Sequence, residues 1–127
     1  MTNALKIETF PYFFAIAKIR NPASINWKSP FVFVGKTDDE LSLVALESEV
    51  PSDAYPVDRG YRMMRVAGTL DMSLTGILAR ISKVLADEEI PIFAVSTYNT
   101  DYILVKSHTF KNAVQALSRA GYLVTNE

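Results

Sequence analysis

Hydrophobic side chains recur every three or four residues between residues 74 and 85, which is the spacing of an amphipathic helix. Ser73 or Asp71 stands just before this stretch, where a side chain that caps a helix N-terminus is preferred. Pro91 prevents the helix from continuing, because proline lacks the backbone N–H that a helix needs. The pattern therefore predicts a helix that ends at about Glu89.

A second helical stripe lies near the end of the chain. Its apolar positions again fall three or four residues apart, at Phe110, Ala113, Val114 and Leu117. Ser107 or Thr109 can open this helix. Gly121 provides a C-terminal stop, because glycine accepts the left-handed backbone that ends many helices. The second half of the chain is thus expected to contain two helices.

Runs of strand length flank these helices, at residues 61–69, 92–95, 102–105 and 122–124. The run at 92–95 is expected to be a buried strand, and Asn99 and Thr100 turn the chain into the next strand. The order strand, helix, strand, strand, helix, strand is a split βαβ arrangement. Right-handed crossovers then place both helices on one face of a four-stranded sheet. We therefore predict an α+β fold, a ferredoxin-like βαββαβ sandwich.

The first half of the chain predicts strands at residues 12–19 and 30–35. The segment 21–27 between them is too short and too poor in apolar periodicity for more than a turn or a helical stub. Polar residues then lead into another apolar run, so we expect a hairpin from Phe31 to Leu46. The competing interpretation is a short helix from Thr37, with Glu40 completing a capping box.

The polar, proline-containing stretch from Glu47 to Gly60 breaks both periodicities and is predicted to be a linker. It divides the chain into a β-rich half, residues 1–58, and a second domain, residues 59–127.

Composition and charge exclude several classes of protein. Of the 127 residues, 49% are hydrophobic and 21% are charged, so the whole chain is expected to fold. Thirteen basic and fourteen acidic residues give a net charge of -1, which provides no electrostatic attraction for nucleic acid. With no cysteine, disulfides and thiolate sites are excluded, and a reducing cytoplasm fits this composition.

We expect a soluble, cytoplasmic protein that does not enter membranes. The N-terminus lacks the basic start, apolar run and cleavage site of a signal peptide. The apolar stretch at residues 10–19 is interrupted by Pro11 and Lys18 and is shorter than the ~20 residues of a membrane span.

No set of residues predicts catalysis, a metal or a cofactor. The acidic residues 87–89 lie beyond the apolar stripe, where a solvated face explains them. His108 is the single histidine, and no visible partner completes a metal ligand set or a nucleophile–base pair with it. RNA-recognition motifs share the strand–helix order, but residues 101–106 lack the glycine and alternating aromatics of that motif. RNA binding is therefore not expected.

Several stretches resemble the ACT domain family. Residues 74–81, Leu-Thr-Gly-Ile-Leu-Ala-Arg-Ile, resemble the Pro-Gly-apolar-Leu-x-x-Ile entry into the first ACT helix, with Thr75 in place of proline. Residues 96–105, Ser-Thr-Tyr-Asn-Thr-Asp-Tyr-Ile-Leu-Val, are similar to a run in a subgroup that includes the CASTOR-type arginine sensors and small stand-alone bacterial ACT proteins. Residues 31–34 and 39–44 resemble the degenerate first ACT-like half of that bacterial subgroup.

The resemblance implies an ACT domain at residues 59–127, preceded by a degenerate ACT-like β-rich half at residues 1–58. It also implies a non-catalytic regulatory protein that binds an amino acid, associates as a homodimer or higher homo-oligomer, and acts on an effector protein. The alternative is an oligomerisation or protein-docking module without a small-molecule ligand.

The family's ligand-binding residues correspond here to Leu74, Thr75, Gly76 and Ile77 in the helix entry, and to Thr97, Tyr98 and Asp101 at the strand end. A helix N-terminus has unpaired N–H groups and a dipole that favours the ligand carboxylate. The Asp101 carboxylate can pair with the ammonium group or with a cationic side chain. Purely structural roles compete with ligand contact: close packing on the sheet for Gly76, a local turn role for Asp101, and strand-end packing for Tyr98.

Overall fold

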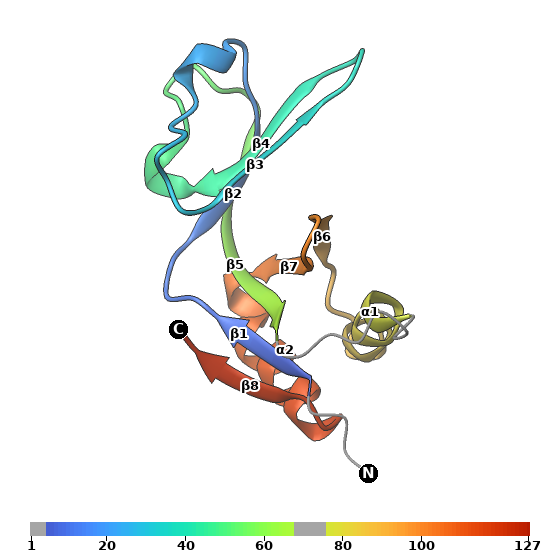
Figure 1. The fold of residues 1–127 in the computed structure, drawn as a ribbon. Coiled ribbons are helices and arrows are strands. Elements are labelled where there is room, and N and C mark those ends of the chain that lie inside the picture. Colours follow the sequence, from blue (N-terminus) through green and yellow to red (C-terminus); the bar gives the residue numbers. More distant parts are fainter. Residues whose placement is uncertain (1–4, 68–75) are drawn as a thin grey trace. The chain divides into compact units, whose positions relative to one another are not determined.

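The computed structural model describes residues 5–67 and 76–127 (Figure 1). These residues form eight β-strands and two α-helices in the order β1 (Lys6–Thr9), β2 (Phe14–Lys18), β3 (Val32–Lys36), β4 (Leu41–Leu46), β5 (Val57–Ala67), α1 (Ile77–Asp87), β6 (Phe93–Ser96), β7 (Asp101–Lys106), α2 (Ser107–Arg119) and β8 (Leu123–Asn126). Two short 3₁₀ helices are η1 (Pro22–Ser24) and η2 (Glu47–Glu49). The predicted α+β class and both predicted helices are confirmed.

The chain divides into two compact units. We call the unit formed by residues 5–11 and the described residues from 62 onward the helical unit, because it contains α1 and α2. We call residues 12–61 the β unit. The first residues of β5 belong to the β unit, and its last residues belong to the helical unit. The predicted domains, residues 1–58 and 59–127, stay a prediction.

The strands of the helical unit follow the order β6, β7, β5, β1, β8. β6 and β7 are antiparallel, and β1 runs antiparallel to β5 and parallel to β8. The four-stranded sheet expected here is wrong in one respect, because the N-terminal strand β1 lies between β5 and β8 (Figure 1). β1 has only four residues, and the strands that it pairs with lie far away in the sequence, so no local pattern predicts it.

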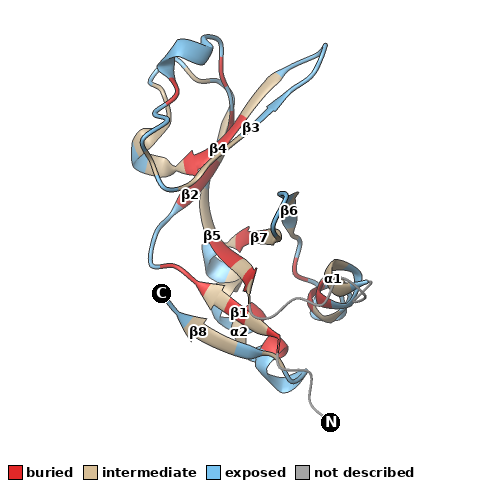
Figure 2. Ribbon diagram, in the orientation of Figure 1, coloured by how far each residue is buried: buried red, intermediate tan, exposed pale blue. Residues whose placement is uncertain are grey.

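Both helices pack on one face of this sheet, as predicted. The shared core contains Ile7, Met64, Val66, Ile103 and Val105 from the strands, and Ile81, Leu85, Ala113 and Leu117 from the helices. All of these residues are at most 2% exposed, and Figure 2 shows the buried positions on β1, β5 and β7. Full burial of one such aliphatic side chain contributes roughly 1.5–3 kcal/mol. This cluster is therefore a major source of stability for the helical unit.

A buried polar side chain strengthens the pairing of β1 with β8. Thr9 is only 2% exposed. Its Oγ1 lies 3.1 Å from the carbonyl oxygen of Thr125 and 2.9 Å from Oδ1 of Asn126. Because a buried hydroxyl without a partner is costly, these contacts favour the strand register that is observed.

Arg62 fixes the chain where it leaves β1. Its Nε and Nη2 atoms donate hydrogen bonds to the carbonyl oxygen of Phe10, at 3.2 and 2.7 Å. The guanidinium also lies 4.1 Å from the centroid of the Phe110 ring in α2. Partial burial lowers the pKa of Arg62 below its ordinary value. One side chain thereby joins the end of β1, β5 and α2.

In the β unit, β4 pairs antiparallel with β2 and with β3, and β2 also pairs antiparallel with the first residues of β5. The residues that pack together on one face are Ile19, Ile25, Leu43 and Ala45, with Val32, Leu41 and Ala54 against them. The segment between β2 and β3 forms only η1, as the prediction of a helical stub implied. Its first turn is capped by Asn21, whose Oδ1 accepts from the Ala23 N–H at 2.9 Å.

The predicted hairpin from residue 31 to residue 46 is confirmed, and the competing helix from Thr37 is wrong. β3 and β4 pair from Val32 opposite Ala45 to Lys36 opposite Leu41. The Thr37 N–H donates to the Glu40 carbonyl at 2.9 Å and closes the turn. The Thr37 hydroxyl, which could have capped a helix, instead accepts from turn amides.

Three local predictions are corrected by the structure. The predicted linker ends too late, because β5 begins at Val57 and pairs with β2 from there. The strand at residues 92–95 is not buried, since β6 pairs with β7 alone among the described strands and Phe93 is 36% exposed. α1 ends at Asp87 rather than near Glu89, where the backbone has turned to φ 59°.

The predicted N-caps of α1, Ser73 and Asp71, lie outside the described residues, and the residue before α1 is Gly76. α2 begins at Ser107, as predicted. Gly121 follows α2 with φ 102°, and its N–H donates to the Ser118 carbonyl at 3.1 Å, so the predicted glycine stop is confirmed.

The insertion of β1 into the sheet generates a stability prediction. Ile7 is fully buried in the core of the helical unit, so Ile7→Ala should destabilise the protein by about 2–5 kcal/mol. Urea unfolding followed by circular dichroism measures this loss. The control is Lys6→Ala on the same strand, which should change stability by less than about 0.5 kcal/mol because Lys6 lies off the core. Equal unfolding midpoints for Ile7→Ala and wild type would contradict the placement of β1.

Candidate functional site

The helix entry of the predicted site is described only in part. Leu74 and Thr75 lie outside the described residues. Gly76 is exposed and has φ 73°, a left-handed conformation that favours glycine. Among the described residues, an added Cβ would meet only Arg80 Nη1, at 3.4 Å. The backbone conformation, rather than close packing on the sheet, therefore explains this glycine. Ile77 is half-buried and packs against the core.

The strand-end residues of the predicted site meet in the turn between β6 and β7. The Thr97 N–H donates to the Thr100 carbonyl at 2.8 Å, and the Thr97 hydroxyl donates to the same oxygen at 2.9 Å. Ser96 faces Asp101 across the hairpin, and Ser96 Oγ donates to Asp101 Oδ1 at 2.5 Å. The turn is therefore closed by its own side chains, with the Asp101 carboxylate half-buried beside it.

Tyr98 at the tip of this turn is fully exposed. Packing at a strand end, which competed with ligand contact as its role, is therefore wrong for the described part of the chain. An exposed aromatic ring can contact a ligand or another protein at little conformational cost. Asn99 beside it is exposed as well.

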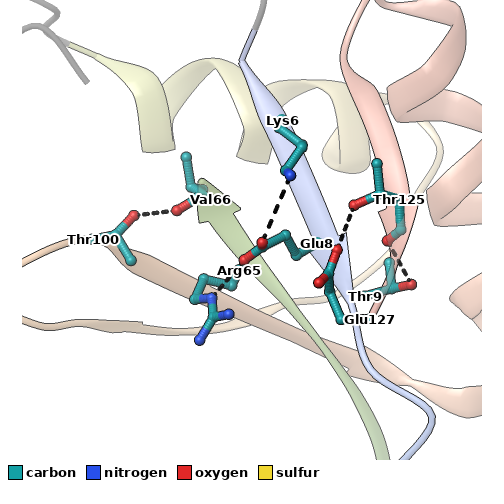
Figure 3. Close-up of polar contacts among 8 residues, drawn as sticks. All are labelled: Lys6, Glu8, Thr9, Arg65, Val66, Thr100, Thr125 and Glu127. Carbon is teal, nitrogen blue, oxygen red and sulfur yellow. Dashed lines mark hydrogen bonds and ion pairs between the residues drawn. The ribbon is translucent and has the colours of Figure 1, made fainter. Parts of the chain in front are cut away.

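Thr100 is not among the residues of the predicted site. Its Oγ1 donates to the Val66 carbonyl oxygen at 2.5 Å, and Figure 3 shows this bond between the turn and β5. Val66 is the last residue but one of β5, just before the segment that leads to Gly76. The two threonines of the Thr-Tyr-Asn-Thr run could have signalled such a contact, but its partner is 34 residues away and no local pattern names it.

A second polar group lies on the sheet face away from the helices. Ile7 and Val66 point into the helical core, so the alternation of side chains along a strand places Glu8 and Arg65 on the opposite face. Arg65 Nε lies 2.7 Å from Glu8 Oε1, and Lys6 Nζ lies 3.9 Å from Glu8 Oε2 (Figure 3). This ion pair ties β1 to β5.

Aromatic rings complete the surroundings of Arg65. Its guanidinium lies 4.9 Å from the centroid of the Phe10 ring and 6.0 Å from that of Tyr102. Desolvation alone would lower the pKa of Arg65, but its interactions with Glu8 and Tyr102 raise that pKa above its ordinary value. Because the Arg65 guanidinium is paired with Glu8, we interpret this ion pair as stabilising the sheet rather than as a cation available to a ligand.

An open groove of about 310 Å³ lies elsewhere in the helical unit. It is lined by Arg80, Lys83, Val84 and Asp87 from α1, and by Ala120 and Tyr122 after α2. Of the predicted site residues that the structure describes, none lines it. Lys83 and Asp87 form an exposed ion pair at 3.1 Å across one helical turn. The charged side chains that line the groove among the described residues are exposed, whereas the polar groups that orient a small ligand are usually enclosed.

The other titratable residues singled out in the sequence lie at the surface of the described part of the chain. Asp87 pairs with Lys83, and Glu88 pairs with Arg119 at 3.6 Å, both at the surface, so the predicted solvated face is confirmed. His108 is exposed at the start of α2. In the described part of the chain, no group of three or more His, Asp or Glu side chains could hold a metal ion. Across residues 5–67 and 76–127, no helix is long and apolar enough to cross a membrane.

Comparison with known sequences identifies one family. Residues 57–119 match the sequence profile of the ACT domain. This range extends from the first residue of β5 to the last residue of α2, and it includes both halves of the predicted site. The chain matches none of the curated proteins with which it was compared.

Solved structures extend the similarity over nearly the whole chain. A protein of Agobacterium tumefaciens is 30% identical, with a TM-score of 0.88 over 98% of this chain and 95% of that one. A Vibrio cholerae protein of unknown function, named as a possible transport protein, is 16% identical, with a TM-score of 0.72 over 91% and 89%. Aspartate kinase of Clostridium acetobutylicum, an allosteric enzyme, is 14% identical, with a TM-score of 0.67 over 95% of this chain but 35% of the kinase. The last two similarities show the fold alone.

The ion pair on the sheet face away from the helices can be tested with a double-mutant cycle. We expect Glu8→Gln and Arg65→Met to show a coupling free energy near 1 kcal/mol at low salt, because Glu8 is only 13% exposed. The control cycle uses Lys83→Met and Asp87→Asn, whose exposed pair should couple by less than about 0.5 kcal/mol. Chemical unfolding of each variant gives the numbers. If the two cycles gave the same coupling, the pair would not hold β1 in place.

Proposed function

We propose that the chain, whose residues 57–119 match the ACT domain, is a regulatory protein that binds an amino acid and catalyses no reaction. The observation that carries the proposal is the turn at residues 97–100, with the Asp101 carboxylate held next to it. The allosteric aspartate kinase with the same fold adds a precedent for regulation.

We assign the ligand to the residues that resemble the family's binding residues. By that resemblance, Leu74, Thr75, Gly76 and Ile77 are assigned to the ligand carboxylate, and Thr97, Tyr98 and Asp101 to the rest of the ligand; Leu74 and Thr75 lie outside the described residues. Backbone N–H groups at a helix start attract an anion, since they lack partners within the helix. The Gly76 conformation, with no side chain over the backbone, favours close approach of the ligand there.

The side near Asp101 suits a cation. Among the described residues, the Ser96 hydroxyl donates to one of its carboxylate oxygens, and a carboxylate has further lone pairs that suit an ammonium or a guanidinium group. Arginine is our first candidate ligand, because residues 96–105 resemble the corresponding run of the CASTOR-type arginine sensors. Other amino acids satisfy the same chemistry through their ammonium group.

The regulatory role that we propose also needs an assembly and a partner. The edge strand β6 carries exposed apolar surface at Phe93, which suits association of two copies. We propose a homodimer or higher homo-oligomer in the cytoplasm, in which bound amino acid changes the contact with an effector protein.

The alternative function is an oligomerisation or protein-docking module without a small ligand. The fully exposed Tyr98 favours it, because an aromatic side chain at a turn tip is equally suited to a protein interface. The two functions differ in one respect: a docking module is indifferent to every free amino acid.

A thermal-shift screen of the purified protein against the twenty amino acids tests the proposal. A ligand at ~100 times its dissociation constant adds roughly 2.7 kcal/mol to the free energy of unfolding and raises the melting midpoint. Asp101→Asn removes the charge and retains the shape, so it should abolish the shift. Asp87→Asn, an exposed carboxylate on α1, is the matched control and should leave the shift unchanged.

A shift that survives in Asp101→Asn would remove Asp101 from the site. If none of the amino acids raised the melting midpoint of the wild-type protein, the docking function would replace the proposed one.

A further inference from the structure

Thr100 links the turn of the proposed site to the end of β5. Its hydroxyl donates to the carbonyl oxygen of Val66 at 2.5 Å (Figure 3). Val66 precedes Ala67, the end of β5, and the chain from there leads to Gly76 and the start of α1. Thr100 itself lies in the turn that carries Thr97 and Tyr98. The bond thus connects the end of β5 with the turn that carries the described strand-end residues of the proposed site.

The acceptor of this bond is rigidly held. Val66 is 2% exposed and belongs to the core cluster of the helical unit. It faces Ile7 in the β1–β5 ladder, and its neighbour Arg65 is paired with Glu8. A group that is hydrogen-bonded to the Val66 carbonyl is therefore anchored to the packed core of this unit.

On the donor side of the bond, Thr100 holds the side chains that we assign to the ligand. The Thr100 carbonyl accepts both the N–H and the hydroxyl of Thr97, at 2.8 and 2.9 Å, so the two threonines move together. Asp101 follows Thr100 directly, and Ser96 holds its carboxylate from the opposite strand. Fixing the Thr100 side chain thus fixes both ends of the turn.

We propose that Thr100 is a positioning residue of the amino-acid site: its hydroxyl fixes the 97–101 turn to the end of β5 and holds Thr97 and Asp101 ready for the ligand. This role rests on the proposed function. Thr100 does not need to touch the ligand, since it acts through the turn. A site that is already ordered loses less conformational entropy when the ligand binds, so its affinity is higher.

The test compares Thr100→Val, which removes the hydroxyl and retains the shape, with Thr100→Ser, which retains the hydroxyl. The matched control is Thr109→Val, because the Thr109 hydroxyl also donates to a backbone carbonyl, that of Lys106, at 2.9 Å, outside the turn. Amide hydrogen exchange of the ligand-free proteins is measured by NMR at Thr97. Exchange should be about tenfold faster in Thr100→Val, from the loss of one net hydrogen bond, and unchanged in the other two variants.

The second measurement is titration of each variant with the amino acid that gives the largest thermal shift in the wild-type protein. Thr100→Val should bind about tenfold more weakly, while Thr100→Ser and Thr109→Val should bind within about twofold of wild type. Unchanged exchange at Thr97, or faster exchange with wild-type affinity, would overturn the positioning role while amino-acid binding stands. If no amino acid shifts the wild-type protein, the proposed function fails, and the exchange rates alone decide whether Thr100 orders the turn.

Discussion

The position of β1 between β5 and β8 is the constraint on which the helical unit depends. A strand in that place satisfies the backbone groups of two neighbours at once, and its loss would leave both with unpaired edges. Ile7 adds a fully buried side chain to the core, and Thr9 adds a satisfied buried hydroxyl. Four residues from the start of the chain thus complete a sheet whose other strands come from residues 62–126.

This constraint explains the polar contacts around β5. Because β5 has β1 on one side and β7 on the other, contacts from both neighbours converge on its last residues. Glu8 reaches Arg65 from β1, and Thr100 reaches the Val66 carbonyl from the turn before β7 (Figure 3). Arg62 adds the carbonyl of Phe10 and the ring of Phe110. β5 is thereby linked to β1, to the turn before β7 and to α2.

The proposed site suits ligand binding better than chemistry. Its described strand-end side chains are Thr97, Tyr98 and Asp101, in and beside a turn that is closed by its own hydrogen bonds. Such groups recognise a carboxylate and an ammonium by charge and hydrogen bonds, but they provide no nucleophile paired with a base. A binding module of this kind influences other proteins through the free energy of its ligand, which is how a regulatory domain acts.

The sequence by itself determined the elements whose signals are local. The apolar stripes predicted both helices, Gly121 predicted the end of α2, and the polar residues after Lys36 predicted a hairpin, because each depends on neighbours within a few residues. Through resemblance it also indicated the ACT family and brought Thr97 and Asp101 into one turn. Only the tertiary structure decided the place of β1, the exposure of β6 and the bond from Thr100 to Val66. Strand order and edge exposure are set by pairing between distant residues, and the partner of a hydroxyl is chosen only when those strands meet.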